Sequence, residues 1–196
     1  MDPVSYTHLL QLHLWEPGDS VLRTEFNENW EKIDGETAQI RADSIMTRLG
    51  QYKNTSAAVN AVFDLSGVDM SKFYKLELLI TGVTASDASL WLRVNKDSGS
   101  GRYVDSGGNA SDRCYLAYLD ASIPVADITV TLSNGPGRVY LSANYSTYQT
   151  ASSRPSGSGS LAAYSGCALS GLTSITVQAT KNLNKGIEMI LYGYRK

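Results

Sequence analysis

Residues 127–145 decide the fold, and they read Asp127-Ile-Thr-Val-Thr-Leu-Ser-Asn-Gly-Pro-Gly-Arg-Val-Tyr-Leu-Ser-Ala-Asn-Tyr145. Apolar residues alternate with polar ones before and after the Asn134-Gly-Pro-Gly137 segment, which is the period of a strand with one buried face. Proline fixes the backbone φ angle and glycine permits a positive φ, so this segment favours a tight turn. The stretch therefore predicts an antiparallel hairpin of strands near 127–133 and 138–145.

Six further runs in residues 51–196 show the same alternation, and no helical periodicity separates them. In the run near 57–65 the first residue expected to point inward is Val59, and in the run near 73–81 it is Tyr74. Eight short strands without intervening helices are typical of an antiparallel β-sandwich, and the jelly roll is a common eight-stranded form. The sequence therefore predicts a mainly β chain with an eight-stranded, jelly-roll-like sandwich. The six additional strands are expected near 57–65, 73–81, 89–95, 113–120, 174–180 and 187–194.

Two long connections, residues 98–112 and 149–160, interrupt the strand pattern and are rich in glycine and serine. Loops of this length in a compact domain often carry a function, because a rigid scaffold can position them for binding. Tyrosine offers an apolar ring and a hydroxyl, which suits the face and the hydroxyl rim of a sugar. The alternative is that these tyrosines cap the sandwich or pack between subunits. Receptor contacts are expected from residues on or beside the loops: Arg102, Tyr103, Asp105, Tyr145, Tyr148 and Arg154.

Residues 1–50 follow a different pattern. Leu10, Leu12 and Leu14 alternate with polar residues, which predicts a short strand, and Pro17-Gly18 then ends it. A short amphipathic helix follows, with apolar residues at spacings of four and three. This spacing is that of a coiled-coil seam, although the same stripe also suits a helix that packs on its own domain. The expected oligomer seam consists of Phe26, Trp30, Ile33, Thr37 and Ile40.

The predicted division of the chain is an N-terminal segment, residues 1–50, and a β head, residues 51–196. The segment is extended and then helical, which suits docking onto another protein better than folding as an independent domain. Two heptads are too few to hold a coiled coil together in water. We therefore expect the head to share in any assembly.

The composition excludes several classes of function. Of the 196 residues, 42% are apolar and 18% are charged, and the formal net charge is −2. A nucleic-acid-binding protein would carry a basic patch, so we expect no nucleic acid partner. No run approaches the roughly 18 apolar residues of a membrane-spanning helix, and the N-terminus lacks the features of a secretory signal. The two cysteines, Cys114 and Cys167, do not make a disulfide framework and are expected as free thiols or as one bridge.

The residues needed for common catalytic sites are missing from the predicted head. Both histidines, His8 and His13, precede residue 51, which excludes a Ser-His-Asp triad within the head. The sequence has no Gly-x-Ser-x-Gly motif, no phosphate-binding loop and no metal-ligand spacing. We therefore expect no metal, no cofactor and no enzyme activity. A carboxylate pair for glycoside cleavage needs no fixed spacing, so a glycan hydrolase is the less favoured alternative.

Two segments carry a resemblance to a known family. The residues Leu10-Gln-Leu-His-Leu-Trp-Glu-Pro-Gly-Asp19 and Phe26-Asn-Glu-Asn-Trp-Glu-Lys-Ile-Asp34 resemble the N-terminus of tail-fibre and receptor-binding proteins of bacteriophages and prophages. The run Gly186-Ile-Glu-Met-Ile-Leu-Tyr-Gly-Tyr-Arg-Lys196 is similar to the closing strand of such fibres. The family pattern falls on Phe26, Asn27, Asn29, Trp30, Lys32, Ile33 and Asp34, none of which is a catalytic position.

The resemblance implies a virion protein that is assembled in the cytoplasm of a bacterial host and is usually a homotrimer. Its N-terminus would attach to other proteins of the tail, baseplate or head of the particle, and its β head would bind a host surface glycan. We therefore expect a non-enzymatic attachment protein. The main alternative is a structural decoration or connector protein whose head binds other virion proteins. A strongly apolar exposed patch on the head would favour that alternative.

Overall fold

The computed structural model describes residues 5–7, 10–15, 18, 20, 22–56, 58–82, 88–119, 125–148, 156–183 and 185–196. The chain divides into two units, Met1–Ser44 and Ile45–Lys196. The boundary expected at residues 50 and 51 falls inside the strand β3 (Met46–Lys53). The sequence hides this strand because polar residues and Gly50 interrupt its alternation, whereas pairing with the last strand of the chain stabilises it.

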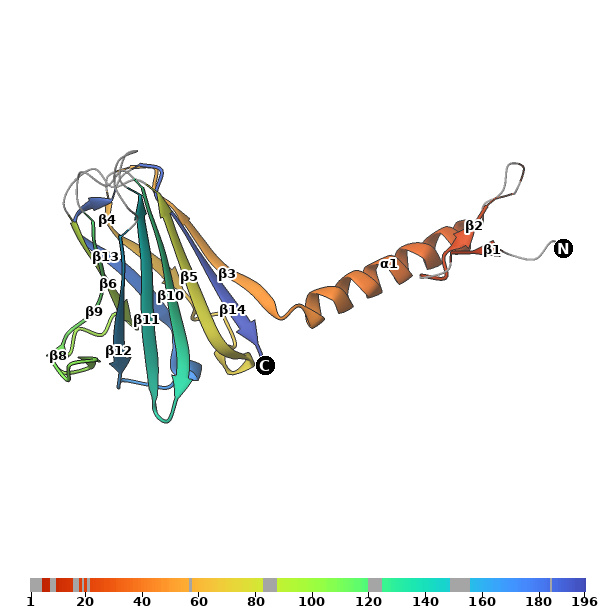
Figure 1. Ribbon diagram of the computed structural model, residues 1–196. Helices are drawn as coiled ribbons and strands as arrows, with labels where there is room; N and C mark the ends of the chain where they lie inside the picture. Colours follow the sequence, from red (N-terminus) through yellow and green to blue (C-terminus); the bar gives the residue numbers. More distant parts are fainter. Residues whose placement is uncertain are drawn as a thin grey trace. The chain divides into compact units, whose positions relative to one another are not determined.

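The N-terminal unit consists of the helix α1 (Arg23–Asp43) and a two-stranded sheet (Figure 1). The strand β1 (Ser5–Tyr6) pairs antiparallel with β2 (His13–Leu14). The helix expected after Pro17-Gly18 is confirmed, but the strand expected over Leu10–Leu14 is limited to its last two residues. Gln11 has a positive φ of 53°, and its backbone N–H donates to the Thr7 carbonyl over 3.2 Å, so a turn replaces the first part of the strand.

Asn29 fastens β2 to α1. Its Oδ1 accepts a hydrogen bond from the backbone N–H of His13 over 2.8 Å, and its Nδ2 donates to the His13 carbonyl over 3.2 Å. The Lys32 ammonium donates to the carbonyl of Gln11 over 2.6 Å. Two residues of the resemblance pattern, Asn29 and Lys32, therefore hold the extended segment against the helix.

The unit Ile45–Lys196 contains two antiparallel sheets, and Figure 1 shows them as two layers. The large sheet has the order β3-β14-β5-β10-β11-β12-β7-β8, and the small sheet has the order β4-β13-β6-β9. The buried side chains of both sheets form one hydrophobic core. The strands other than β3 are β4 (Ala58–Asp64), β5 (Phe73–Gly82), β6 (Ala88–Val94), β7 (Tyr103–Asp105), β8 (Ala110–Ser111), β9 (Cys114–Leu119), β10 (Val125–Gly135), β11 (Arg138–Tyr148), β12 (Ser156–Tyr164), β13 (Ser174–Leu183) and β14 (Glu188–Arg195), with 3₁₀ turns at Met70–Lys72 and Leu169–Gly171.

The mainly β, antiparallel fold is confirmed, and all eight predicted strands are present. The hairpin of β10 and β11 is continuous from the pair Val125 and Tyr148 to the pair Gly135 and Arg138. Gly137 takes a φ of 65° in the turn, as the Pro-Gly signal predicts. Among the described residues, α1 is the only α-helix.

Four strands of this unit were not predicted: β3, β7, β8 and β12. The strand β12 covers Ser156-Gly-Ser-Gly-Ser-Leu-Ala-Ala-Tyr164, part of which was expected as the loop 149–160. Glycine and serine favour strands weakly, but β12 pairs with β11 along its whole length, and this pairing outweighs local preference. The expected loop 98–112 likewise contains β7 and β8, which pair with each other.

Two residues expected to face the core are exposed. Val59 is 44% exposed and Tyr74 is 46% exposed. The pairing of β13 with β4 shifts register between Gln178 and Leu183, beside Val59, and the pairing of β14 with β5 shifts between Tyr194 and Arg195, beside Tyr74. A bulge inserts one residue and so reverses the side to which the neighbouring side chain points.

Candidate functional site

Tyr103 belongs to the core, which corrects its expected role as a receptor contact. It is 1% exposed, and its ring lies 4.9 Å from that of Tyr164 between centroids. Its hydroxyl oxygen accepts a hydrogen bond from the backbone N–H of Val94 over 2.7 Å. Burial raises the pKa of the Tyr103 hydroxyl above its ordinary value of 10.0. The alternative that loop tyrosines cap the sandwich therefore holds for this residue.

Asp97 holds the beginning of the 98–112 segment in place through contacts with Gly99, Arg102 and Tyr164. Its carboxylate accepts hydrogen bonds from the backbone N–H of Gly99 over 2.8 Å and from the Tyr164 hydroxyl over 2.9 Å. These two hydrogen bonds lower the pKa of the Asp97 carboxyl below 3.8, and the bond from Gly99 has the larger effect. The Arg102 guanidinium lies 3.6 Å from the same carboxylate and is about half exposed. Arg102 is therefore at the surface, where it is paired with Asp97.

Asp105 is exposed and orders the turn between β7 and β8. Its Oδ1 accepts hydrogen bonds from the backbone N–H groups of Gly107 over 2.8 Å and Asn109 over 2.9 Å. The Asn109 side chain donates to both carboxylate oxygens, over 3.2 and 3.0 Å. These hydrogen bonds lower the pKa of the Asp105 carboxyl below 3.8, and those from the Asn109 side chain have the largest effect. The group is therefore ionised at neutral pH.

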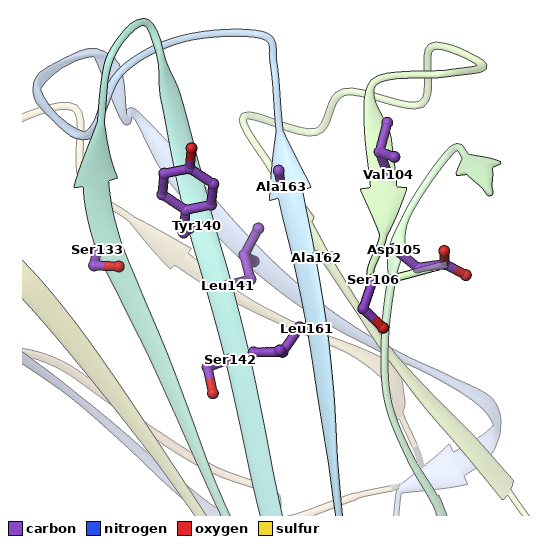
Figure 2. A pocket seen from close by; sticks show the side chains of 10 residues that line it. All are labelled: Val104, Asp105, Ser106, Ser133, Tyr140, Leu141, Ser142, Leu161, Ala162 and Ala163. Carbon is purple, nitrogen blue, oxygen red and sulfur yellow. The ribbon is translucent and has the colours of Figure 1, made fainter. Parts of the chain in front are cut away.

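A hollow of about 390 Å³, here called the sheet hollow, lies on the outer face of the large sheet over β10, β11, β12 and β7 (Figure 2). Ser133, Tyr140, Ser142 and Leu161 occupy outward positions of their strands, whereas Leu141 is a buried residue of the core. Its lining combines one aromatic ring, aliphatic side chains, three serine hydroxyls and one carboxylate. The lining residues are Val104, Asp105, Ser106, Ser133, Tyr140, Leu141, Ser142, Leu161, Ala162 and Ala163.

Tyr140 provides the aromatic surface of the sheet hollow and is 45% exposed. A Cβ atom on Gly135 would lie 2.3 Å from the Cε2 atom of the Tyr140 ring, so the ring packs directly against the glycine backbone. A side chain at position 135 would force the ring away. The sheet hollow therefore contains an exposed aromatic ring that packs against Gly135, and Ser133 and Ser142 line the same hollow.

A second hollow of about 160 Å³, here called the edge hollow, adjoins the turn between β7 and β8. The Trp91 and Tyr115 rings meet edge to face with centroids 5.1 Å apart, and the Arg113 guanidinium lies 4.9 Å from the centroid of the Trp91 ring. Three residues line both hollows, namely Asp105, Leu161 and Ala162. The remaining lining residues of the edge hollow are Trp91, Tyr103, Asn109, Ala110, Ser111, Arg113, Cys114 and Tyr115.

The structure thus brings one predicted residue, Asp105, to both hollows. Tyr145 and Tyr148 belong to β11, where only their backbone is described, and Arg154 lies outside the described residues. Sequence reasoning missed Trp91, Tyr115 and Tyr140, because each occupies an outward position of a strand. The available signal was an aromatic residue where the alternation leads one to expect a polar one.

The apolar stripe of α1 is open to solvent in the single chain. Phe26, Trp30 and Ile40 are 47%, 53% and 70% exposed. The Phe26 and Trp30 rings lie 5.9 Å apart between centroids, at 72° to each other. Thr37 is exposed and Ile33 is partly buried. These exposures leave an apolar surface available to a partner.

Cys114 and Cys167 are both free thiols, which decides between the two expectations for them. Burial raises the pKa of the Cys114 thiol to about 12. In the part of the chain that the structure describes, no group of three or more His, Cys, Asp or Glu side chains could hold a metal ion. None of the described helices has the length and apolarity needed to cross a membrane.

Comparison of the sequence with protein-family models and with curated proteins gives no match.

Proposed function

We propose that this chain is a bacteriophage virion attachment protein that binds a saccharide of the host surface through its β head, without catalysis. One observation carries the proposal: the exposed Tyr140 ring packs against Gly135 in the sheet hollow, which the hydroxyl-bearing Ser133 and Ser142 also line. A sugar ring has an apolar face and a rim of hydroxyls. An aromatic surface can cover the face, while hydroxyls and carboxylates bond the rim.

The N-terminal unit supports the attachment part of the proposal. Its resemblance to phage fibre proteins rests on residues that have physical roles here, since Asn29 and Lys32 hold the extended segment on α1. We propose that this unit binds other virion proteins of the tail, baseplate or head, and that the protein is located in the virion after assembly in the host cytoplasm.

The exposed stripe of α1 supports a homotrimer. Phe26, Trp30, Ile33, Thr37 and Ile40 would form a coiled-coil-like seam, in which the exposed rings of Phe26 and Trp30 become buried. Three identical heads on one assembly would bind a repetitive surface polymer much more strongly than one head, because each bound head raises the effective concentration of the others.

For the head we retain the jelly-roll-like class as a proposal. Its support is that the strands from β3 to β6 alternate between the sheets, since β3 and β5 lie in the large sheet and β4 and β6 lie in the small one. The alternative is a structural connector whose head binds other virion proteins. It is supported by the exposed apolar side chains of Val59 and Val62 on the edge strand β4.

The binding claim is tested by titrating the purified full chain with a panel of neutral and acidic bacterial surface oligosaccharides. The matched variants are Tyr140→Ala, in the sheet hollow, and Tyr74→Ala, which removes a tyrosine of equal exposure elsewhere in the head. Loss of the stacking surface should weaken binding about tenfold, or by about 1.4 kcal/mol. We expect Tyr74→Ala to bind as the unmodified chain does. Binding that is unchanged in Tyr140→Ala, or absent for every saccharide, would contradict the proposal.

A further inference from the structure

Three residues of the sheet hollow form a row across the outer face of the large sheet (Figure 2). Tyr140 on β11 pairs with Ala163 on β12, and Ala163 pairs with Val104 on β7. Neighbouring strands lie about 4.8 Å apart, so Tyr140 and Val104 are about 10 Å apart with Ala163 between them. The row therefore has a small residue between two larger ones, and this small residue forms part of the floor of the hollow.

Leu161 borders one end of this floor. It lies on β12 two residues before Ala163, so its side chain points to the same face of the sheet, about 7 Å away. Leu161 is 57% exposed and Val104 is 36% exposed, so both are accessible to a ligand. We call the space over Ala163 that Tyr140, Leu161 and Val104 border the apolar corner.

The Tyr140 ring leaves the apolar corner open. It packs over Gly135 of β10, and β10 and β12 lie on opposite sides of β11. The ring is therefore turned away from Ala163, which keeps part of its surface exposed. A sugar ring that stacks on Tyr140 can accordingly place one of its substituents over Ala163.

The apolar corner suits a methyl group better than a hydroxyl group. The cross-strand neighbours of Ala163 are Tyr140 and Val104, and the serines that line the hollow pair with other residues. A hydroxymethyl group placed there would exchange hydrogen bonds to water for contacts with carbon atoms, which is unfavourable. A methyl group would instead gain from the burial of its apolar surface.

We propose that the sheet hollow selects a 6-deoxyhexose, a sugar whose C5 carries a methyl group in place of the hydroxymethyl group of the common hexoses. The sugar ring would stack on Tyr140, and its methyl group would contact Ala163, Leu161 and Val104 in the apolar corner. This inference rests on the proposed saccharide-binding function and names the class of sugar that the site prefers.

The test is an NMR titration of the full chain with methyl glycosides in matched pairs whose members differ only at C6. The pairs are L-rhamnose with L-mannose, L-fucose with L-galactose, and 6-deoxy-D-glucose with D-glucose. In the pair whose ring hydroxyls fit the site best, we expect the deoxy sugar to bind about tenfold more tightly than its partner.

Two variants separate the apolar corner from the stacking surface. Leu161→Ser replaces one apolar side of the corner by a hydroxyl and should lower the deoxy preference to about twofold or less. Tyr140→Ala should weaken both members of the pair alike and so leave their ratio unchanged. Val62→Ser changes an exposed valine on β4 of the small sheet and is the matched control, which should keep the full preference. Thermal unfolding of each variant verifies that the head is folded.

The outcomes distinguish this inference from the function on which it rests. If the two members of every pair bind equally, and Tyr140→Ala weakens them, the inference is overturned and the proposed function stands. The same holds if no member of the pairs binds but another saccharide binds through Tyr140. A deoxy preference that persists unchanged in Leu161→Ser also overturns the inference. If no saccharide of any kind binds, both are overturned.

Discussion

The Tyr140 ring packs against the backbone of Gly135, so closely that a Cβ at position 135 would come within 2.3 Å of the ring. The two residues lie on the same face of the β10–β11 hairpin, where Tyr140 pairs with Ser133 and Gly135 pairs with Arg138. The position of the aromatic surface in the sheet hollow therefore depends on the absence of a side chain at residue 135.

Gly135→Ala should displace the Tyr140 ring and weaken saccharide binding about as much as Tyr140→Ala does, roughly tenfold. The fold should survive, because alanine is accepted in a strand and the ring can turn into solvent. Titration with the best-bound saccharide measures the effect. The control is Gly67→Ala, where an added Cβ would meet no atom within 4 Å. Unchanged binding in Gly135→Ala would mean that the ring position is unimportant.

Asn29→Ala should release the extended segment from α1. The substitution removes both hydrogen bonds to the His13 backbone, at a cost of about 1–3 kcal/mol for the two together. Hydrogen exchange at the His13 amide measures the loss directly, and its rate should rise about tenfold or more. Asn27→Ala, in the same sequence pattern but exposed, is the matched control. Equal exchange in the two variants would show that Asn29 does not fasten β2.

The Asp105 carboxyl should titrate below 3.8, and Asn109→Ala should raise its pKa toward that value. Because the folded-state pKa is lowered, the ionised group stabilises the turn at every pH above 3.8. This stabilisation is lost only as the pH falls from 3.8 through the lower folded-state value. Saccharide binding should therefore be constant from about pH 5 to about pH 8. Carboxyl chemical shifts measured by NMR as a function of pH test this, and a value at or above 3.8 would contradict it.

Trp30→Ser should prevent assembly of the trimer, because it removes the largest exposed apolar side chain of the seam. Light scattering should give the mass of three chains for the unmodified protein and a lower mass for the variant. Glu31→Ser changes the next, also exposed, residue of α1 and should leave the trimer intact. A monomer that persists at high concentration in the unmodified protein would rule out the seam.

Alternation of apolar and polar residues was sufficient to predict eight strands, because most of the corresponding core positions are buried as expected. It failed where pairing rather than composition makes a strand. The serine and glycine residues of β12 have weak local preference, and β11 supplies the hydrogen bonds that order them. It also failed at the bulges beside Val59 and Tyr74, because one inserted residue reverses the alternation and leaves no mark in the sequence.

Among the described side chains, two of the predicted receptor contacts line the candidate site, Asp105 in both hollows and Tyr103 in the edge hollow. The reason that the others were missed is physical. Tyr103 and Tyr140 have the same side chain, but Tyr103 pairs with Tyr164 on the core side of the large sheet, whereas Tyr140 lies on its outer side. The side on which a residue of a three-residue strand lies depends on a partner far away in the sequence. The aromatic lining of the two hollows likewise depends on which strands become neighbours, which alternation alone does not determine.

The most direct test of the account is a crystal structure of the full chain with the tightest-binding saccharide of the panel. We expect a sugar ring stacked on Tyr140 in the sheet hollow, with hydroxyl groups bonded to the serine and Asp105 oxygens. A saccharide bound at a site that excludes Tyr140, on either unit of the chain, would contradict it.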